Sequence, residues 1–258
     1  MISPPSMLMR APLLRRLIPS LLRRYAKFFK HRYSVEKRMG AFFLIDQKNS
    51  VDRNLLIKGR WEPDQIKTLL KSIAEHHRRG EKVVFLDIGS LAALYSIMIA
   101  QQGIATRIIA FEPEPGNLVQ LRANLLLNGL LDRVEVIPVA VGDKAGKIPF
   151  YVAKESNKGT SRMTASDMHL IERQIEVDTM PVDEILQLSG EFIVAKIDVE
   201  GSELTVLAGM EKLISSNRCL LQIESFDENV ANLKTWLDAK GFVYLSTVAF
   251  DHYFLKDA

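Results

Sequence analysis

Cysteine is nearly absent from this chain of 258 residues, in which Cys219 is the single one. A lone cysteine excludes an intrachain disulfide framework, and such usage is typical of a reducing compartment. Cys219 and the five histidines show none of the spacings of a zinc site, so we expect no metal centre. Because Cys219 lies in an apolar segment, we expect it to be a small buried residue.

The chain also lacks a long uninterrupted apolar run. Residues 7–33 have apolar residues at helical spacing, but arginine pairs interrupt them too often for a membrane span. They also lack the apolar core and cleavage site of a secretory signal. Three roles fit this basic stretch: a helix on an anionic membrane surface, an organelle-targeting segment, or an arm packed on the protein body. We expect a cytoplasmic protein, with peripheral membrane contact through this arm as one alternative.

Acidic residues are missing from residues 1–32, which carry eight lysines or arginines. Since the whole chain has a formal net charge of +3, the remaining residues have a net charge of −5. A nucleic-acid surface on the main body is therefore not expected. We divide the chain into a basic N-terminal arm with a helical extension, residues 1–60, and one globular domain, residues 61–258.

From residue 62 onward, short apolar segments alternate with amphipathic ones. Helices are predicted over residues 62–79, 94–102, 116–129, 202–216 and 229–241, and strands over residues 82–88, 106–112, 133–141, 147–153, 191–200, 218–225, 242–248 and 252–257. The strands are continuously apolar, which predicts a parallel sheet covered by helices on both faces. In such sheets, ligands bind at the carboxyl ends of the strands.

The first two of these strand ends carry the residues of a nucleotide site. Gly89 permits a tight turn that brings backbone amides close to a ligand. Glu112 ends the next strand, 25 residues after Asp87, where a carboxylate can accept hydrogen bonds from a ribose diol. For Asp87, a role as a turn or helix-capping acid is the alternative.

Four ordered motifs resemble the FkbM-type family of S-adenosylmethionine-dependent methyltransferases. They are FLDIG, IIAFEPEPGNLVQLRANLLLNG, VEVIPVAVGDKAGKIPFYV and AKIDVEGSELTVLAGM, within about residues 82–225. The resemblance implies the α/β fold of a class I methyltransferase (Rossmann-like): a seven-stranded, mostly parallel sheet with helices on both faces and the last strand antiparallel. It also implies S-adenosylmethionine as cofactor, and O-methylation of a hydroxyl on a small molecule or glycan.

The resemblance further implies roles for single residues of the cofactor site. Glu112 would hold the ribose hydroxyls, and the loop with Asp87 and Gly89 the methionine end. Asn117 would be a further cofactor-binding residue, and Asp143 would accept from the adenine amino group.

The first loop departs from the family pattern. Leu91 stands where the family has asparagine, and Ala93 where it has a second glycine. An alanine within the helix is tolerated, whereas an alanine with a positive φ angle is strained. The alternative function is therefore a catalytically inactive relative that binds a nucleoside or a partner. A nicotinamide-dependent oxidoreductase is disfavoured because G-x-G-x-x-G is missing.

The candidate catalytic groups cluster after the strand over residues 191–200. Lys196 and Asp198 share one face of this strand, and Glu200 lies beyond its end. Asp198, held ionised by Lys196, is a candidate general base for a hydroxyl. The alternative is a structural ion pair, with Glu203 capping the following helix. His169, which follows a polar loop of residues 154–166 in the position of a substrate lid, is a further candidate base.

Overall fold

The computed structural model describes residues 32–154, 159, 161, 163, 169 and 171–257. Within the chain there are two compact units, Met1–Trp61 and Glu62–Ala258. Most of the basic arm and most of the polar loop over residues 154–166 lie outside the described residues. Across the part of the chain that is described, none of the helices is long and apolar enough to span a membrane.

The described part of the first unit is a hairpin followed by a helix. Strand β1 (Tyr33–Arg38) pairs antiparallel with β2 (Ala41–Asp46), and α2 (Ser50–Lys58) comes next. The prediction of a helical extension is thus wrong for residues 33–46, which form the two strands of this hairpin. The physical reason is the turn: Met39 and Gly40 both have positive φ angles, 51° and 87°, as a two-residue hairpin turn requires.

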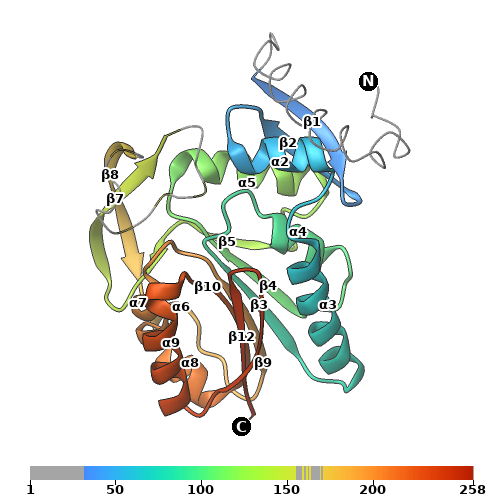
Figure 1. Cartoon of the computed structure of the whole chain (residues 1–258). Coiled ribbons are helices and arrows are strands. Elements are labelled where there is room, and N and C mark those ends of the chain that lie inside the picture. The colour runs from blue at the N-terminus through green and yellow to red at the C-terminus, as the bar shows by residue number, and fades with distance from the viewer. Residues whose placement is uncertain are drawn as a thin grey trace. The chain divides into compact units, whose positions relative to one another are not determined.

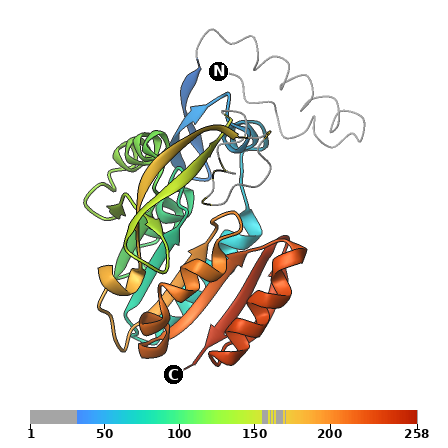
Figure 2. The same ribbon diagram turned by 90° about the vertical axis from the view of Figure 1, so that its left-hand side faces the viewer.

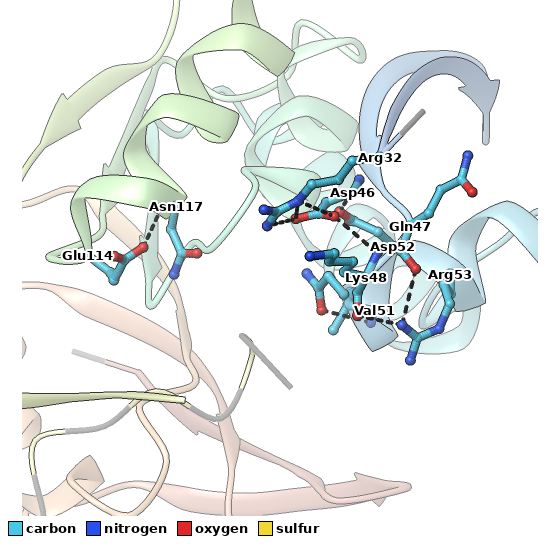
Figure 3. Close-up of polar contacts among 10 residues, drawn as sticks. Arg32, Asp46, Gln47, Lys48, Val51, Asp52, Arg53, Glu114 and Asn117 are labelled. Carbon is cyan, nitrogen blue, oxygen red and sulfur yellow. Dashed lines mark hydrogen bonds and ion pairs between the residues drawn. The ribbon is translucent and has the colours of Figure 1, made fainter. Parts of the chain in front are cut away.

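A buried carboxylate ties this small unit together. Asp46 accepts hydrogen bonds from the Arg32 guanidinium, the shortest being 2.8 Å from Nη2 to Oδ2 (Figure 3). Its backbone amide donates to Asp52 Oδ2 of α2 at 2.8 Å. The end of β2 and the first turns of α2 are therefore held by the same pair of acids.

A seven-stranded sheet forms the core of the second unit, in the order β11-β12-β10-β9-β3-β4-β5. Its strands are β3 (Val83–Ile88), β4 (Arg107–Phe111), β5 (Glu135–Ile137), β9 (Phe192–Ile197), β10 (Arg218–Glu224), β11 (Val243–Val248) and β12 (Asp251–Lys256). The last strand, β12, runs antiparallel to β10 and β11, and the other pairs of neighbouring strands in this sheet are parallel. The predicted seven-stranded, mostly parallel sheet with a reversed last strand is confirmed (Figure 1).

Helices lie on both sides of this sheet (Figures 1 and 2). They are α3 (Pro63–Arg78), α4 (Leu94–Ala100), α5 (Pro115–Leu127), α6 (Val182–Ile185), α7 (Glu203–Ala208), α8 (Glu211–Ser216) and α9 (Asp227–Ala239). On one face, Leu86, Ala195 and Leu221 are in register and form a core with apolar residues of α7, α8 and α9. The opposite face packs against α3, where His76 stacks on Phe192 with ring centroids 3.6 Å apart.

A second, three-stranded sheet has the order β6-β8-β7. It consists of β6 (Ala140–Val141), β7 (Gly146–Ala153) and β8 (Ile171–Met180). The single strand predicted over residues 133–141 is therefore two strands in different sheets, because Pro138 between them has no amide hydrogen to continue a ladder. Strand β8 was not predicted, since most of its side chains are exposed and polar and give no apolar run.

The helix predicted over residues 202–216 is two helices, α7 and α8. Gly209, between them, lies so close to the chain that a Cβ there would be 1.9 Å from the carbonyl oxygen of Gly142. The second helix has its own start signal, since the Asp183 carboxylate accepts from the amides of Lys212 and Leu213, each at 2.8 Å. Close packing and this cap interrupt a segment whose periodicity is continuous.

Candidate active site

The loop after β3 has three residues in left-handed conformation. The φ angles are 81° at Gly89, 47° at Leu91 and 61° at Ala93, which directly precedes α4. Ala93 therefore has the positive φ angle that strains an alanine, and it is not an ordinary helical residue. A non-glycine residue in this region costs about 1 kcal/mol or more relative to glycine. At positions 91 and 93 the backbone has the left-handed conformation that favours glycine, but the sequence has leucine and alanine there.

Gly89 joins this loop to the neighbouring strand end. A Cβ at position 89 would lie 1.9 Å from the backbone oxygen of Asp198. In addition, the amides of Gly89 and Ser90 both donate to the carbonyl of Phe111 at the end of β4. The ends of β3, β4 and β9 thus meet at this glycine, as parallel strands at one edge of a sheet must.

Asp87 anchors the helix that follows the loop. It is 1% exposed, and its Oδ2 accepts from the Ser96 amide at 3.0 Å and from the Ser96 hydroxyl at 2.7 Å. Burial raises the pKa of this carboxyl, partly offset by the charge of Lys196 and these two hydrogen bonds. Asp87 holds α4 against the end of β3, and this is the capping role that the sequence left open.

Glu112 bridges the loops that follow β3 and β4. Its Oε2 accepts from the Leu91 amide at 2.9 Å, and its Oε1 from the Glu114 amide at 2.9 Å and Asn117 Nδ2 at 3.3 Å. Burial raises the pKa of Glu112 to about 7, although these hydrogen bonds favour the ionised form. This carboxylate is at the position where the sequence predicted a ribose acceptor.

Asn117 presents a buried acceptor beside Glu112. Glu114, at the start of α5, accepts from the Asn117 amide at 2.6 Å (Figure 3) and from Arg173 at 3.3 Å. The Asn117 side chain is 3% exposed, and its Oδ1 has no hydrogen-bond partner within the described part of the chain. A buried amide oxygen without a donor is costly, so this atom fits the hydroxyl or amino group of a ligand.

Asp143 is in a different loop from Glu112 and Asn117. It is exposed in the turn between β6 and β7. Just before it, Gly142 is confined, since a Cβ there would lie 2.5 Å from Thr179 Oγ1. Among the described residues, no hydrogen bond joins the Asp143 side chain to Glu112 or Asn117.

The polar face of the sheet is centred on Lys196. This residue is in register with Asp87 on one side and Gln222 on the other. Its Nζ donates to Asp198 Oδ2 at 2.7 Å and lies 4.9 Å from the centroid of the Tyr95 ring. Burial lowers the pKa of Lys196, but the charges of Asp198, Glu62 and Asp87 raise it more, so the ammonium is held protonated. The predicted Lys196–Asp198 pair is present.

Several members of this polar network were not predicted. Tyr95 donates to Glu62 Oε2 at 2.7 Å, and Gln222 Nε2 donates to Tyr95 Oη at 3.1 Å and to Asp251 Oδ1 at 2.7 Å. Glu224, one residue past the end of the β9–β10 register, hydrogen-bonds Asp198. Burial and the charge of Asp198 raise the pKa of Glu224 well above its usual range. Polar residues inside otherwise apolar strands were the available signal.

The remaining candidates lie around this network. Glu200 is partly buried with a φ angle of 54°. Glu203 accepts from the Gly201 amide at 2.7 Å, so it caps the loop before α7, and burial raises its pKa. His169 is exposed. Within the described residues there is no group of three or more histidine, cysteine or acidic side chains that could hold a metal ion.

The family model for the methyltransferase FkbM domain matches residues 68–244. The chain belongs to this family. The chain is similar to a hexuronic acid methyltransferase, AglP, of Haloferax volcanii, which is 30% identical over 61% of this chain and 59% of its own length. The 2-O-methyltransferase NoeI of Sinorhizobium fredii is 30% identical over 52% of this chain and 60% of its own. The chain thus spans about three-fifths of each of these relatives.

Solved structures of methyltransferases are also similar to this chain. The FkbM methyltransferase of Methylobacillus flagellatus has a TM-score of 0.44 and 19% identity, covering 68% of this chain and 43% of its own.

Proposed function

We propose that the protein transfers the methyl group of S-adenosylmethionine to a hydroxyl oxygen of a small molecule or glycan. The observation that carries the proposal is the pair of acceptors at the end of β4, Glu112 and the unpartnered Oδ1 of Asn117. Family membership supports the reaction class. The names of two relatives, a hexuronic acid methyltransferase and a 2-O-methyltransferase, support a hydroxyl-bearing acceptor.

The cofactor would be held at the edge formed by β3 and β4. Glu112 Oε2, which accepts one hydrogen bond from the Leu91 amide, has a lone pair left for a ribose hydroxyl, and the unpartnered Asn117 Oδ1 adds an acceptor for the nucleoside. Gly89 and Asp87 shape the loop that would receive the methionine end. Asp143 is proposed as the acceptor for the adenine amino group. The sulfonium carries its own leaving group, so the protein mainly positions the acceptor.

Asp198 is the proposed base. This carboxylate would accept the proton of the acceptor hydroxyl, and S-adenosylmethionine, when bound, would supply the methyl group with its own sulfide leaving group. Its side chain is 25% exposed at the edge of the sheet, and Lys196 holds it at 2.7 Å. Glu200 and His169 are the further candidates for this proton.

Calorimetric titration with S-adenosylmethionine, and separately with NADH, tests the proposal. We expect micromolar binding of S-adenosylmethionine alone, weakened by Glu112→Ala and unchanged by Glu135→Ala, an exposed carboxylate paired with Arg107. A folded protein that binds neither compound would support instead the inactive, partner-binding alternative. Transfer of labelled methyl to hydroxyl-bearing probes then tests catalysis.

We also propose that the basic residues 1–32 contact an anionic membrane surface. Eight basic residues without an acid support this. Cosedimentation with phosphatidylserine vesicles should be lost at high salt and on vesicles of neutral lipid. Salt-independent cosedimentation would contradict an electrostatic contact.

A further inference from the structure

Phe226 and Phe250 form an exposed aromatic pair at the carboxyl end of β10. Their side chains are 51% and 57% exposed, and their ring centroids lie 5.2 Å apart at an angle of 46°. Phe226 follows β10, and Phe250 is in the turn between β11 and β12. The Ser225 amide donates to the Phe250 carbonyl at 3.1 Å, which fixes the two segments together. Paired aromatic rings left open to water are typical of a binding surface.

The aromatic pair adjoins the polar network of the candidate active site. Glu224 precedes Phe226 by two residues, Asp251 directly follows Phe250, and these two acids lie opposite each other in the β10–β12 ladder. Glu224 in turn hydrogen-bonds Asp198, the proposed base. An apolar surface and a pair of hydrogen-bonding carboxyl groups therefore meet at one end of one strand.

The network also holds an acceptor without a donor. Gln222 is fully buried, and its Nε2 donates to Tyr95 and Asp251, while its Oε1 has no hydrogen-bond partner within the described residues. The network therefore has one buried hydrogen-bond acceptor, next to Asp251, that is not satisfied by the described residues.

The strand order sets the distances to the cofactor edge. Neighbouring strands of a sheet lie about 4.8 Å apart. In this sheet β10 is next to β9, which carries Lys196, and β3 is next beyond. The backbones of β10 and β3 are therefore two strand spacings, about 10 Å, apart at this edge of the sheet. Cofactor and acceptor can occupy the same edge without overlapping.

We propose that Phe226 and Phe250 bind the acceptor as a carbohydrate, by contact with the apolar C–H face of a sugar ring. This inference rests on the proposed methyltransfer and names the acceptor class for it. A sugar ring combines an apolar face with hydroxyl groups at its rim, which Asp198 and Glu224 would contact. A flat phenolic acceptor would use the aromatic pair but would leave most of the buried polar groups unmatched.

Labelled methyl transfer from S-adenosylmethionine tests this with three probes: methyl β-D-glucuronide, methyl β-D-glucoside and catechol. For the glycoside that is methylated, Phe226→Ala and Phe250→Ala should each raise KM about ten-fold, which is about 1.4 kcal/mol. The kcat and the affinity for S-adenosylmethionine should stay unchanged, and Phe226→Tyr should retain the wild-type KM. The matched control is Phe42→Ala, since the Phe42 side chain in the first unit is 43% exposed.

Failure of the proposed function and failure of the carbohydrate assignment would give different results. Absence of S-adenosylmethionine binding by the wild type would overturn the proposed function. Binding without methylation of either glycoside, or methylation of catechol alone, would overturn the carbohydrate assignment. An unchanged KM in both alanine variants would overturn the role of the pair, and a changed oligomeric state with unchanged KM would assign it to contact between copies of the chain.

Discussion

Leu91 and Ala93 hold a backbone conformation that glycine adopts without strain. Relative to glycine, a side chain at a φ angle near 60° costs about 1 kcal/mol or more. We therefore expect Ala93→Gly to raise the free energy of unfolding by about 1 kcal/mol in urea denaturation. Ala92→Gly is the matched control, because Ala92 has no positive φ angle, and it should lower that free energy. Equal losses in both variants would contradict this account.

The buried carboxyl of Glu112 should make the free energy of unfolding depend on pH, and the direction follows from its raised pKa. Burial raises its pKa from 4.5 to about 7, so the folded state binds the proton more tightly than the unfolded chain does. The stability contributed by this group is full below about pH 4.5 and is lost as the pH rises to 7. This pKa shift corresponds to a loss of about 3 kcal/mol in the free energy of unfolding.

Urea denaturation at pH 4.5 and pH 8 should thus show a smaller drop for Glu112→Gln than for the wild type. The comparison uses the difference between the two pH values, since the glutamine also loses hydrogen bonds at both. An equal drop in the two proteins would mean that Glu112 titrates normally in the fold.

At the scale of elements, Gly89 holds three strand ends together. An alanine there would meet the Asp198 carbonyl at 1.9 Å in addition to having a φ angle of 81°. We expect Gly89→Ala to lower the free energy of unfolding by about 3 kcal/mol, the sum of overpacking and backbone strain. Gly103→Ala is the control, with a φ angle of 65° and nothing within 4 Å, and should lose only about 1 kcal/mol. Similar losses by urea denaturation would refute the close approach.

The strands were predictable where burial is complete and unpredictable where it is not. Strands β3, β9 and β10 are buried nearly throughout, so their sequences are continuous apolar runs. Strand β8 has mostly exposed side chains, so the local pattern of apolar residues carries little signal. The break between α7 and α8 depends on contact with Gly142, which no local pattern encodes.

At the scale of the whole molecule, motifs within single segments named Glu112, Lys196 and Asp198 as candidates but gave no signal for Glu224 and Asp251. Glu224 and Asp251 lie next to the polar network of the candidate site because of the register of β10 with β9 and β12. Their separation in sequence leaves no spacing rule to find them. The aromatic pair of Phe226 and Phe250 depends on the same register.

All candidate cofactor residues lie in one of the two compact units, Glu62–Ala258. A ligand that binds only the folded state, at 100 times its Kd, stabilises that state by about 2.7 kcal/mol. Hydrogen exchange with S-adenosylmethionine should therefore slow the amides of β3, β4 and the loop at Leu91 by up to about 100-fold. Adenine alone, at the same concentration, is the control for non-specific effects. Glu112 directly follows β4. Protection confined to residues 32–61 would therefore place the ligand away from Glu112 and contradict the proposed cofactor site.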